Sequence, residues 1–99
     1  MATIIEGHYE WDEAKAASNL AKHGVSFKEA STAVDDANAI MMPDDSSNNE
    51  IRLRVIGMSA RARLLLVVIV ERRERDRIIS ARRAQGAEET NYAEANRNR

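Results

Sequence analysis

The basic side chains are the residues of this sequence best suited to chemistry, and their type differs between its two halves. Residues 1–50 carry three lysines and no arginine, whereas residues 51–99 carry twelve arginines and no lysine. The first half has a net charge of −7 and the second of +6, so the total of −1 conceals the division. Guanidinium groups bind phosphate and carboxylate as a bidentate fork. The second half therefore favours an anionic partner such as RNA, and the alternative is a sheet edge kept solvated by charge.

Residues suited to acid–base chemistry are few. Lys22 and His23 precede Gly24 at the end of a predicted helix, where this corner could bind phosphate or transfer a proton. Capping the helix dipole is the alternative role. Histidine is the side-chain type that titrates near neutral pH, and the other histidine, His8, falls in an expected leader. The chain has no cysteine and its two histidines lack a third ligand, so we expect no disulfide, thiolate nucleophile, metal site or cofactor.

Six arginines fall at or within predicted strands: Arg52, Arg54, Arg63, Arg77, Arg82 and Arg83. Neighbouring residues on a strand point to opposite faces, so only one of Arg82 and Arg83 can face a given groove. We expect Arg52 or Arg54, together with Arg63 and one of that pair, to share a shallow concave surface. Like charges so placed repel each other, and an anionic ligand offsets that repulsion.

Such a surface could cut RNA without a divalent ion. The 2′-OH of the RNA would attack the adjacent phosphate, with arginine and lysine stabilising the charge of the transition state. A histidine or lysine would act as base or acid, and His23 is the candidate outside the leader. The acidic pairs at residues 35–36 and 44–45 fit a helix end and a turn better than a metal site.

Capping signals predict two helices in the first half of the chain. Asp12 is a good N-cap and Gly24 a left-handed stop, which bound a helix over residues 13–23. Ser26 and Glu29 have the spacing of a capping box that opens a second helix. The short link between the two helices predicts a helical hairpin.

Period-two alternation and apolar runs predict the remaining elements. We expect strands at residues 39–42, 51–55, 64–70 and 77–82, a weaker one at 8–11, a polar loop at 46–49, a turn at 57–62, and a helix over about 86–97. Residues 64–70 are apolar on both faces, as in a central strand covered on both sides. The order predicts an α+β fold: a small antiparallel meander of three to four strands, packed against the helical hairpin and followed by a C-terminal helix.

The length of 99 residues allows one domain, which we expect over residues 9–97 after a flexible leader at 1–8. The longest apolar run has seven residues, whereas a membrane-spanning helix needs about 20. No basic and then apolar segment resembling a secretory signal is seen, so we expect a cytoplasmic protein without membrane contact.

Two stretches, KHGVSF at residues 22–27 and RIISARRA at residues 77–84, are specific when they occur together. Accompanying them in order are Tyr9, Glu10, Trp11, Asp12, Lys15, Asn19, Glu29, Ala30, Glu50, Arg52, Ile56, Gly57, Met58, Ser59, Arg63, Leu64, Leu65, Glu71, Arg72 and Tyr92. From Tyr9 to Tyr92, this set resembles the BrnT family of bacterial type II toxin–antitoxin systems.

The resemblance implies a RelE-like ribonuclease that cuts RNA and arrests translation and growth. It implies a BrnA-type antitoxin that neutralises the toxin in a higher-order oligomer and alone contacts the operon DNA. By this analogy the functional positions are Lys22, His23, Arg52, Arg63, Arg82 and Arg83. We assign catalytic roles to Lys22, His23, Arg63, Arg82 and Arg83, and RNA binding to Arg52, Arg54 and Arg77.

The final helix departs from the family pattern. Many relatives have a basic helix there, whereas this one carries Glu88, Glu89 and Glu94, which suggests a surface for a basic antitoxin. The turn at residues 59–62 also lacks the glycine often seen in relatives.

Two other functions are compatible with the same arginines. A non-catalytic RNA-binding or regulatory partner would keep the surface without cleavage, and an interaction module would use it to meet an acidic protein. Only the enzyme gives discrete RNA cleavage products.

Overall fold

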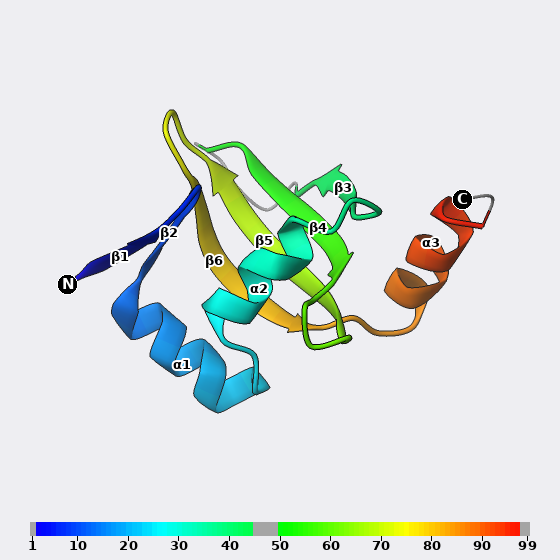
Figure 1. The fold of residues 1–99 in the computed structure, drawn as a ribbon, viewed down its shortest axis with the longest axis horizontal. Helices are drawn as coiled ribbons and strands as arrows, with labels where there is room; N and C mark the ends of the chain where they lie inside the picture. Colours follow the sequence, from blue (N-terminus) through cyan, green and yellow to red (C-terminus); the bar gives the residue numbers. More distant parts are fainter. Residues whose placement is uncertain (1, 45–49, 98–99) are drawn as a thin grey trace.

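The computed structural model describes residues 2–44 and 50–97, which form one mixed sheet and three helices (Figure 1). In chain order these are β1 (Thr3–Glu6), β2 (Tyr9–Asp12), α1 (Glu13–His23), α2 (Phe27–Val34), β3 (Ile40–Pro43), β4 (Arg52–Met58), β5 (Leu64–Glu71), β6 (Asp76–Arg83) and α3 (Ala87–Ala95). The six strands are ordered β1-β2-β6-β5-β4-β3. The loop expected at 46–49 lies outside the described residues.

The first two helices begin and end where their caps predict. Asp12 accepts a hydrogen bond from the Lys15 N–H at 2.9 Å, and Gly24 adopts a left-handed φ of 70° after α1. The Ser26 hydroxyl accepts from the Glu29 N–H at 3.0 Å. The second half of the predicted capping box is wrong, because the Glu29 carboxylate turns instead to Ser59 and Arg63 on the β4–β5 turn. A buried carboxylate gains more from a cation and a hydroxyl than from one backbone N–H.

One face of the sheet and α2 form the core. Its buried members from α2 and the three long strands are Phe27, Ala30, Ala33, Val34, Val55, Leu65, Val67, Ile69, Ile78 and Ala81. The closest approach is at Gly57 of β4, where a Cβ would lie 2.1 Å from the Ala33 carbonyl oxygen. Glycine at this position therefore lets α2 lie directly against the strand.

The prediction of α+β is confirmed, but the predicted meander of three to four antiparallel strands is wrong. Residues 3–6, expected in a leader, form β1 and pair antiparallel with β2 across a turn at Gly7. β2 pairs in parallel with β6 through Tyr9–Asp76 and Glu10–Arg77, which makes the sheet mixed. A parallel partner more than sixty residues away leaves no local pattern, and the mostly exposed β1 lacks a buried face that would alternate.

Strand β4 is also longer than predicted. It continues to Met58, so the turn expected at 57–62 starts later. The last strand and the C-terminal helix agree with their predictions within two residues at each end.

Strand β6 contains a bulge opposite Val68 and Ile69 of β5. Ile78 and Ala81, three positions apart, both lie in the core under α1 and α2. In a regular strand an odd separation puts two residues on opposite faces, so the extra residue of the bulge accounts for their shared face.

The outer edge of β6 is covered by helix α1. β2 pairs with only two residues of β6, and beyond them the Asn19 side chain takes the place of a strand. Its amide donates to the Ala81 carbonyl at 2.8 Å, and its oxygen accepts from the Ala81 N–H at 3.2 Å. The same amide donates to the Val25 carbonyl at 3.0 Å, which fixes the end of α1 on the sheet.

No helix among the described residues is long and apolar enough to cross a membrane.

We predict that Gly57→Ala lowers the free energy of unfolding by about 3 kcal/mol, because the added methyl group must push α2 off the sheet. Chemical denaturation measures the change. The control is Gly7→Ala, whose methyl meets nothing within 4 Å and which has only the strain of its φ of 59°, about 1 kcal/mol. Equal losses in the two variants would contradict the close approach at Gly57.

Candidate functional site

Four of the predicted site residues lie on the sheet face opposite α2. In the register, Arg52 and Arg77 flank Val70, Arg54 lies opposite Val68, and Arg82 lies opposite Leu66. Cross-strand partners share a face, and the intervening residues of β4 and β5 belong to the core under α2. We call Arg52, Arg54, Arg77 and Arg82 the arginine face.

The floor of the arginine face is apolar and buried. Ile56, Leu66 and Val70 are at most 5% exposed although they point away from α2. Arginine can cover such residues with its aliphatic stem while its guanidinium stays near solvent. The Nε atom of Arg52 is buried, and within residues 2–44 and 50–97 it has no hydrogen-bond partner. The face thus offers one unused buried donor.

Glu88 of α3 binds two members of the arginine face. Its two carboxylate oxygens accept from the Arg82 guanidinium at 2.9 and 2.7 Å, and the Arg54 guanidinium lies 3.5 Å away. Arg82 holds the pKa of Glu88 below its usual value despite partial burial. Sequence reasoning placed Glu88 outward toward an antitoxin, and the signal it missed is a carboxylate shortly after the strand that ends in Arg82.

Arg77 has its own internal partner. Its guanidinium donates to the Glu10 carboxylate at 2.6 Å, because the parallel register sets these residues side by side. Within residues 2–44 and 50–97, Arg52 is thus the member of the arginine face without an ion pair, and Glu88 holds Arg54 and Arg82.

Arg63 does not join the arginine face. It lies on the β4–β5 turn, where its guanidinium binds both oxygens of Glu29 and donates to the Gly24 carbonyl at 3.1 Å. The hydrogen bond from Arg63 lowers the pKa of Glu29; burial acts in the opposite direction, and a bond from Ser59 adds to the lowering. Arg63 therefore ties α2 to the turn before β5.

Arg83 points to the other side of the sheet from Arg82. It lies opposite Leu65, which belongs to the core under α2, and its side chain is exposed at the end of β6. The structure thus resolves the choice within the pair: Arg82 belongs to the arginine face.

Lys22 and His23 form a separate corner at the outer edge of β6. Both are exposed at the C-terminal end of α1 and border a hollow of about 280 Å³ between α1 and β6. Lys15 and Ser18 of the same helix and Ser80 of β6 also line it. Asn19 fixes this corner beside β6, as described above, and sequence reasoning gave it no such role.

Helix α3 is also attached at its far end. The Tyr92 hydroxyl donates to Asp36 at 2.6 Å, and the Met58 N–H donates to the same carboxylate at 2.8 Å. Burial alone would raise the pKa of Asp36, but these bonds and one from the Asn38 N–H outweigh it and lower the pKa. Asp36, one of the acidic residues predicted to end the second helix, thus also holds α3.

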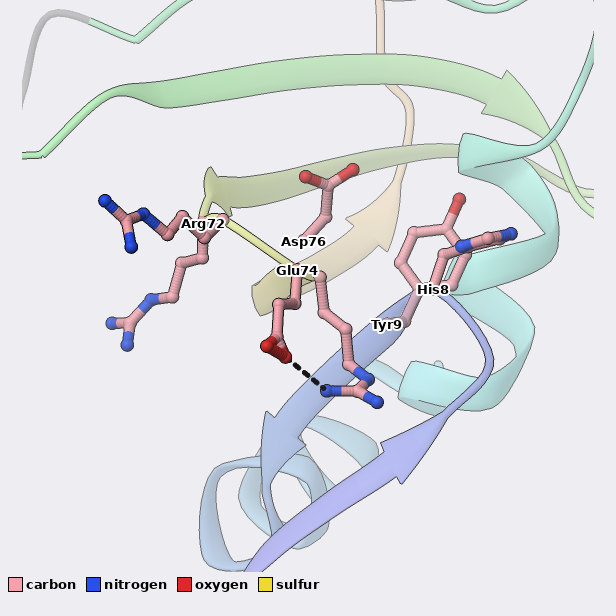
Figure 2. Close-up of a pocket in the computed structure, with 7 residues that line it drawn as sticks. His8, Tyr9, Arg72, Glu74 and Asp76 are labelled. Carbon is pink, nitrogen blue, oxygen red and sulfur yellow. Dashed lines mark ion pairs between the residues drawn. The ribbon is translucent and has the colours of Figure 1, made fainter.

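A second basic hollow, of about 410 Å³, lies where the β5–β6 turn meets the β1–β2 turn (Figure 2). Its lining residues are His8, Tyr9, Arg72, Arg73, Glu74, Arg75 and Asp76. Burial raises the pKa of Asp76, as does Glu71, while His8 opposes the shift. Arg72 binds Glu50 and Arg75 faces Glu74, so this hollow holds charges of both signs.

No group of three or more His, Cys, Asp or Glu side chains that could hold a metal ion is found in the described part of the chain.

Comparison with known families decides the identity of the chain. The family model described as "Ribonuclease toxin, BrnT, of type II toxin-antitoxin system" matches residues 11–88. The chain belongs to the BrnT toxin family. Its fold is also similar to the 1.1 Å crystal structure of the Brucella abortus ribonuclease toxin BrnT, with 26% sequence identity and a TM-score of 0.60.

That match covers 77% of this chain and 94% of the Brucella chain. Among curated proteins no sequence matches. The predicted resemblance to BrnT toxins is thus confirmed, and the arginine face lies on β4 and β6, within the matched residues.

We predict that Glu29→Gln lowers the free energy of unfolding by about 2 kcal/mol at pH 7, since it removes charged hydrogen bonds from a buried site. The pKa of Glu29 is lower in the folded chain, so its contribution is complete above the ordinary value of 4.5. It is lost as the pH falls through the lowered folded value. Denaturation of both proteins between pH 7 and pH 3 measures this.

The difference between wild type and Glu29→Gln should shrink toward pH 3. The control is Glu6→Gln on the exposed strand β1, which should follow the wild type throughout. A difference that stays constant with pH would contradict the assigned ion pair.

Proposed function

We propose that this protein is an endoribonuclease that binds RNA across its arginine face and cleaves it without a metal ion. The observation that carries the proposal is the convergence of Arg54 and Arg82 on one carboxylate, with Arg52 beside them on the same face. Guanidinium groups that converge on a carboxylate can converge on a phosphate in the same way. The fixed cations supply the transition-state stabilisation that a metal ion supplies in other nucleases.

In the proposed reaction, the 2′-oxygen of one nucleotide attacks the adjacent phosphorus. A P–O2′ bond forms and the P–O5′ bond breaks, leaving a 2′,3′-cyclic phosphate and a 5′-hydroxyl. A base takes the proton of the 2′-OH and an acid gives one to the departing 5′-oxygen. We propose that Arg82 stabilises the negative charge of the phosphorane-like transition state.

Lys22 and His23 are the proposed proton-transfer groups. Their corner borders β6 from the edge, and Arg82 is on the same strand, so an RNA strand that crosses β6 can contact both. Arg83 extends the cationic surface at that end of β6, and Arg63 acts by holding the turn before β5. Arg77 adds to RNA binding at the β2 side.

We further propose that the protein acts in the cytoplasm, inhibits translation and growth, and is neutralised by a BrnA-type antitoxin. Membership of a type II toxin–antitoxin family supports a protein antitoxin. The antitoxin would contact the DNA and assemble with the toxin into a higher-order oligomer. Glu89 and Glu94 are the exposed carboxylates of α3 and would meet a basic antitoxin, since Glu88 binds the arginine face.

A non-catalytic RNA-binding protein is the second candidate. It is favoured by the position of His23 at the edge of β6 rather than on the arginine face. Both candidates bind RNA in a salt-dependent manner. Incubation of the purified protein with a structured RNA separates them, since only the enzyme yields discrete fragments.

We predict that Arg82→Ala weakens binding of a single-stranded RNA oligonucleotide about tenfold and reduces the salt dependence of binding by roughly one phosphate contact. Arg73→Ala is the matched control, because it removes the same charge from the β5–β6 turn, at the end of β6 away from Arg82. Its effect should stay below about threefold. Fluorescence anisotropy at several salt concentrations measures both. Equal losses would mean that overall charge, and not the arginine face, binds RNA.

We predict that induced expression without an antitoxin arrests bacterial growth, and that the purified protein degrades RNA in the presence of EDTA. Arg82→Ala and Lys22→Ala should relieve both effects. Arg97→Ala on the C-terminal segment, whose side chain is 70% exposed, should retain them. Normal growth at high expression of folded wild-type protein would refute the proposal.

A further inference from the structure

Helix α3 is attached to the rest of the protein by polar contacts. None of its residues, Ala87–Ala95, is buried. Its ties are Glu88 to the arginine face, Tyr92 to Asp36, and the adjoining Asn96, whose amide donates to the Asn38 carbonyl at 3.1 Å. In Figure 1 it lies apart from α1 and α2, beyond β4. A helix with no fully buried residue can be released at low free-energy cost.

The ion pairs of Glu88 have the geometry of anion recognition. Arg82 donates to both carboxylate oxygens. Arg54 pairs with one of them from β4, which lies on the other side of β5 from β6. The Glu88 side chain is only 14% exposed, so the carboxylate sits inside the arginine face rather than at its rim. Paired guanidinium groups bind a phosphate through the same parallel N–H donors.

The connection to α3 allows it to move. Gly86 precedes the helix with a left-handed φ of 48°, and the space around its Cα is open. The preceding Gln85 N–H donates to the Glu88 carboxylate at 2.9 Å, which closes the first turn of the helix. A hinge at Gly86 could therefore swing α3 off the sheet without any change in the core.

We propose that Arg54 and Arg82 form a phosphate subsite for RNA, and that Glu88 occupies this subsite as an internal competitor until RNA displaces α3. The proposal rests on the proposed RNA-binding function and adds a regulatory role for the C-terminal helix. Without RNA, Glu88 relieves the repulsion between the two guanidinium groups. An RNA strand can outcompete it because the strand brings several phosphates, which Arg52 on the same face can also bind.

With an internal competitor, the apparent affinity for RNA is the intrinsic affinity multiplied by the fraction of molecules whose site is open. If α3 is closed in about nine molecules of ten, its release should tighten RNA binding about tenfold. If Glu88 is a competitor, its removal should tighten RNA binding. If Glu88 merely oriented Arg82, its removal would weaken RNA binding.

The test compares Glu88→Gln with Glu89→Gln. Both remove one negative charge from the first turn of α3, but Glu89 is exposed and has no hydrogen bond or ion pair within the described residues. The probe is a single-stranded RNA oligonucleotide with 2′-O-methyl groups, which cannot be cleaved by 2′-OH attack, and the readout is its Kd by fluorescence anisotropy. We expect Glu88→Gln to bind about tenfold tighter than wild type and Glu89→Gln to change by less than about twofold.

Hydrogen exchange provides a second readout. The amides of residues 87–95 should exchange faster in Glu88→Gln than in Glu89→Gln, and faster in wild type once RNA is added. If Glu88→Gln binds RNA no tighter than Glu89→Gln, or if RNA leaves exchange in α3 unchanged, the competitor proposal is wrong while RNA binding stands. If wild type and both variants all fail to bind RNA, the proposed function itself is wrong.

Discussion

Strand β5 must be covered on both faces, and the rest of the structure follows from this constraint. Its residues from Leu64 to Val70 are all apolar, and it lies between β4 and β6. On one side α2 packs directly against the sheet, which requires glycine at position 57. On the other side no apolar helix is present among the described residues, and arginines from the neighbouring strands lie over Leu66 and Val70. The same arginine side chains can thus shield a hydrophobic floor and present charge above it.

The helices and the long strands could be predicted from the sequence because their signals are local. Asp12, Gly24 and Ser26 make the caps that their types predict. The alternation of arginine and apolar residues on β4 correctly separates its two faces. The parallel pairing of β2 with β6 could not be predicted, since neither strand carries information about so distant a partner. Strand β1 was missed for a related reason: it gains stability from hydrogen bonds to β2 rather than from a buried face.

The candidate site was partly predictable. Alternation places Arg52 and Arg54 together, and strand order brings Arg82 near them. The place of Arg63 depends on Glu29, whose carboxylate the capping pattern had assigned to a backbone N–H. In both Glu29 and Glu88 the sequence shows a helix-opening carboxylate, and the three-dimensional structure shows that each binds an arginine outside its own helix. Glu29 and Glu88 therefore fix the positions of arginine side chains, a role that the net charge of the chain does not reveal.

The bulge in β6 has a consequence for how this family of folds can vary. Arg77 and Arg82 are five residues apart, and an uninterrupted strand would put them on opposite faces. The extra residue of the bulge reverses the alternation of faces beyond it, so both arginines lie on the same side of the sheet. A regular ladder at the present strand length would exchange the sides of Arg82 and Arg83, whereas loss of the one extra residue would leave Arg77 and Arg82 four residues apart and again on one side. The bulge thus lets the strand carry one more residue than its partner without altering the charge pattern of either face.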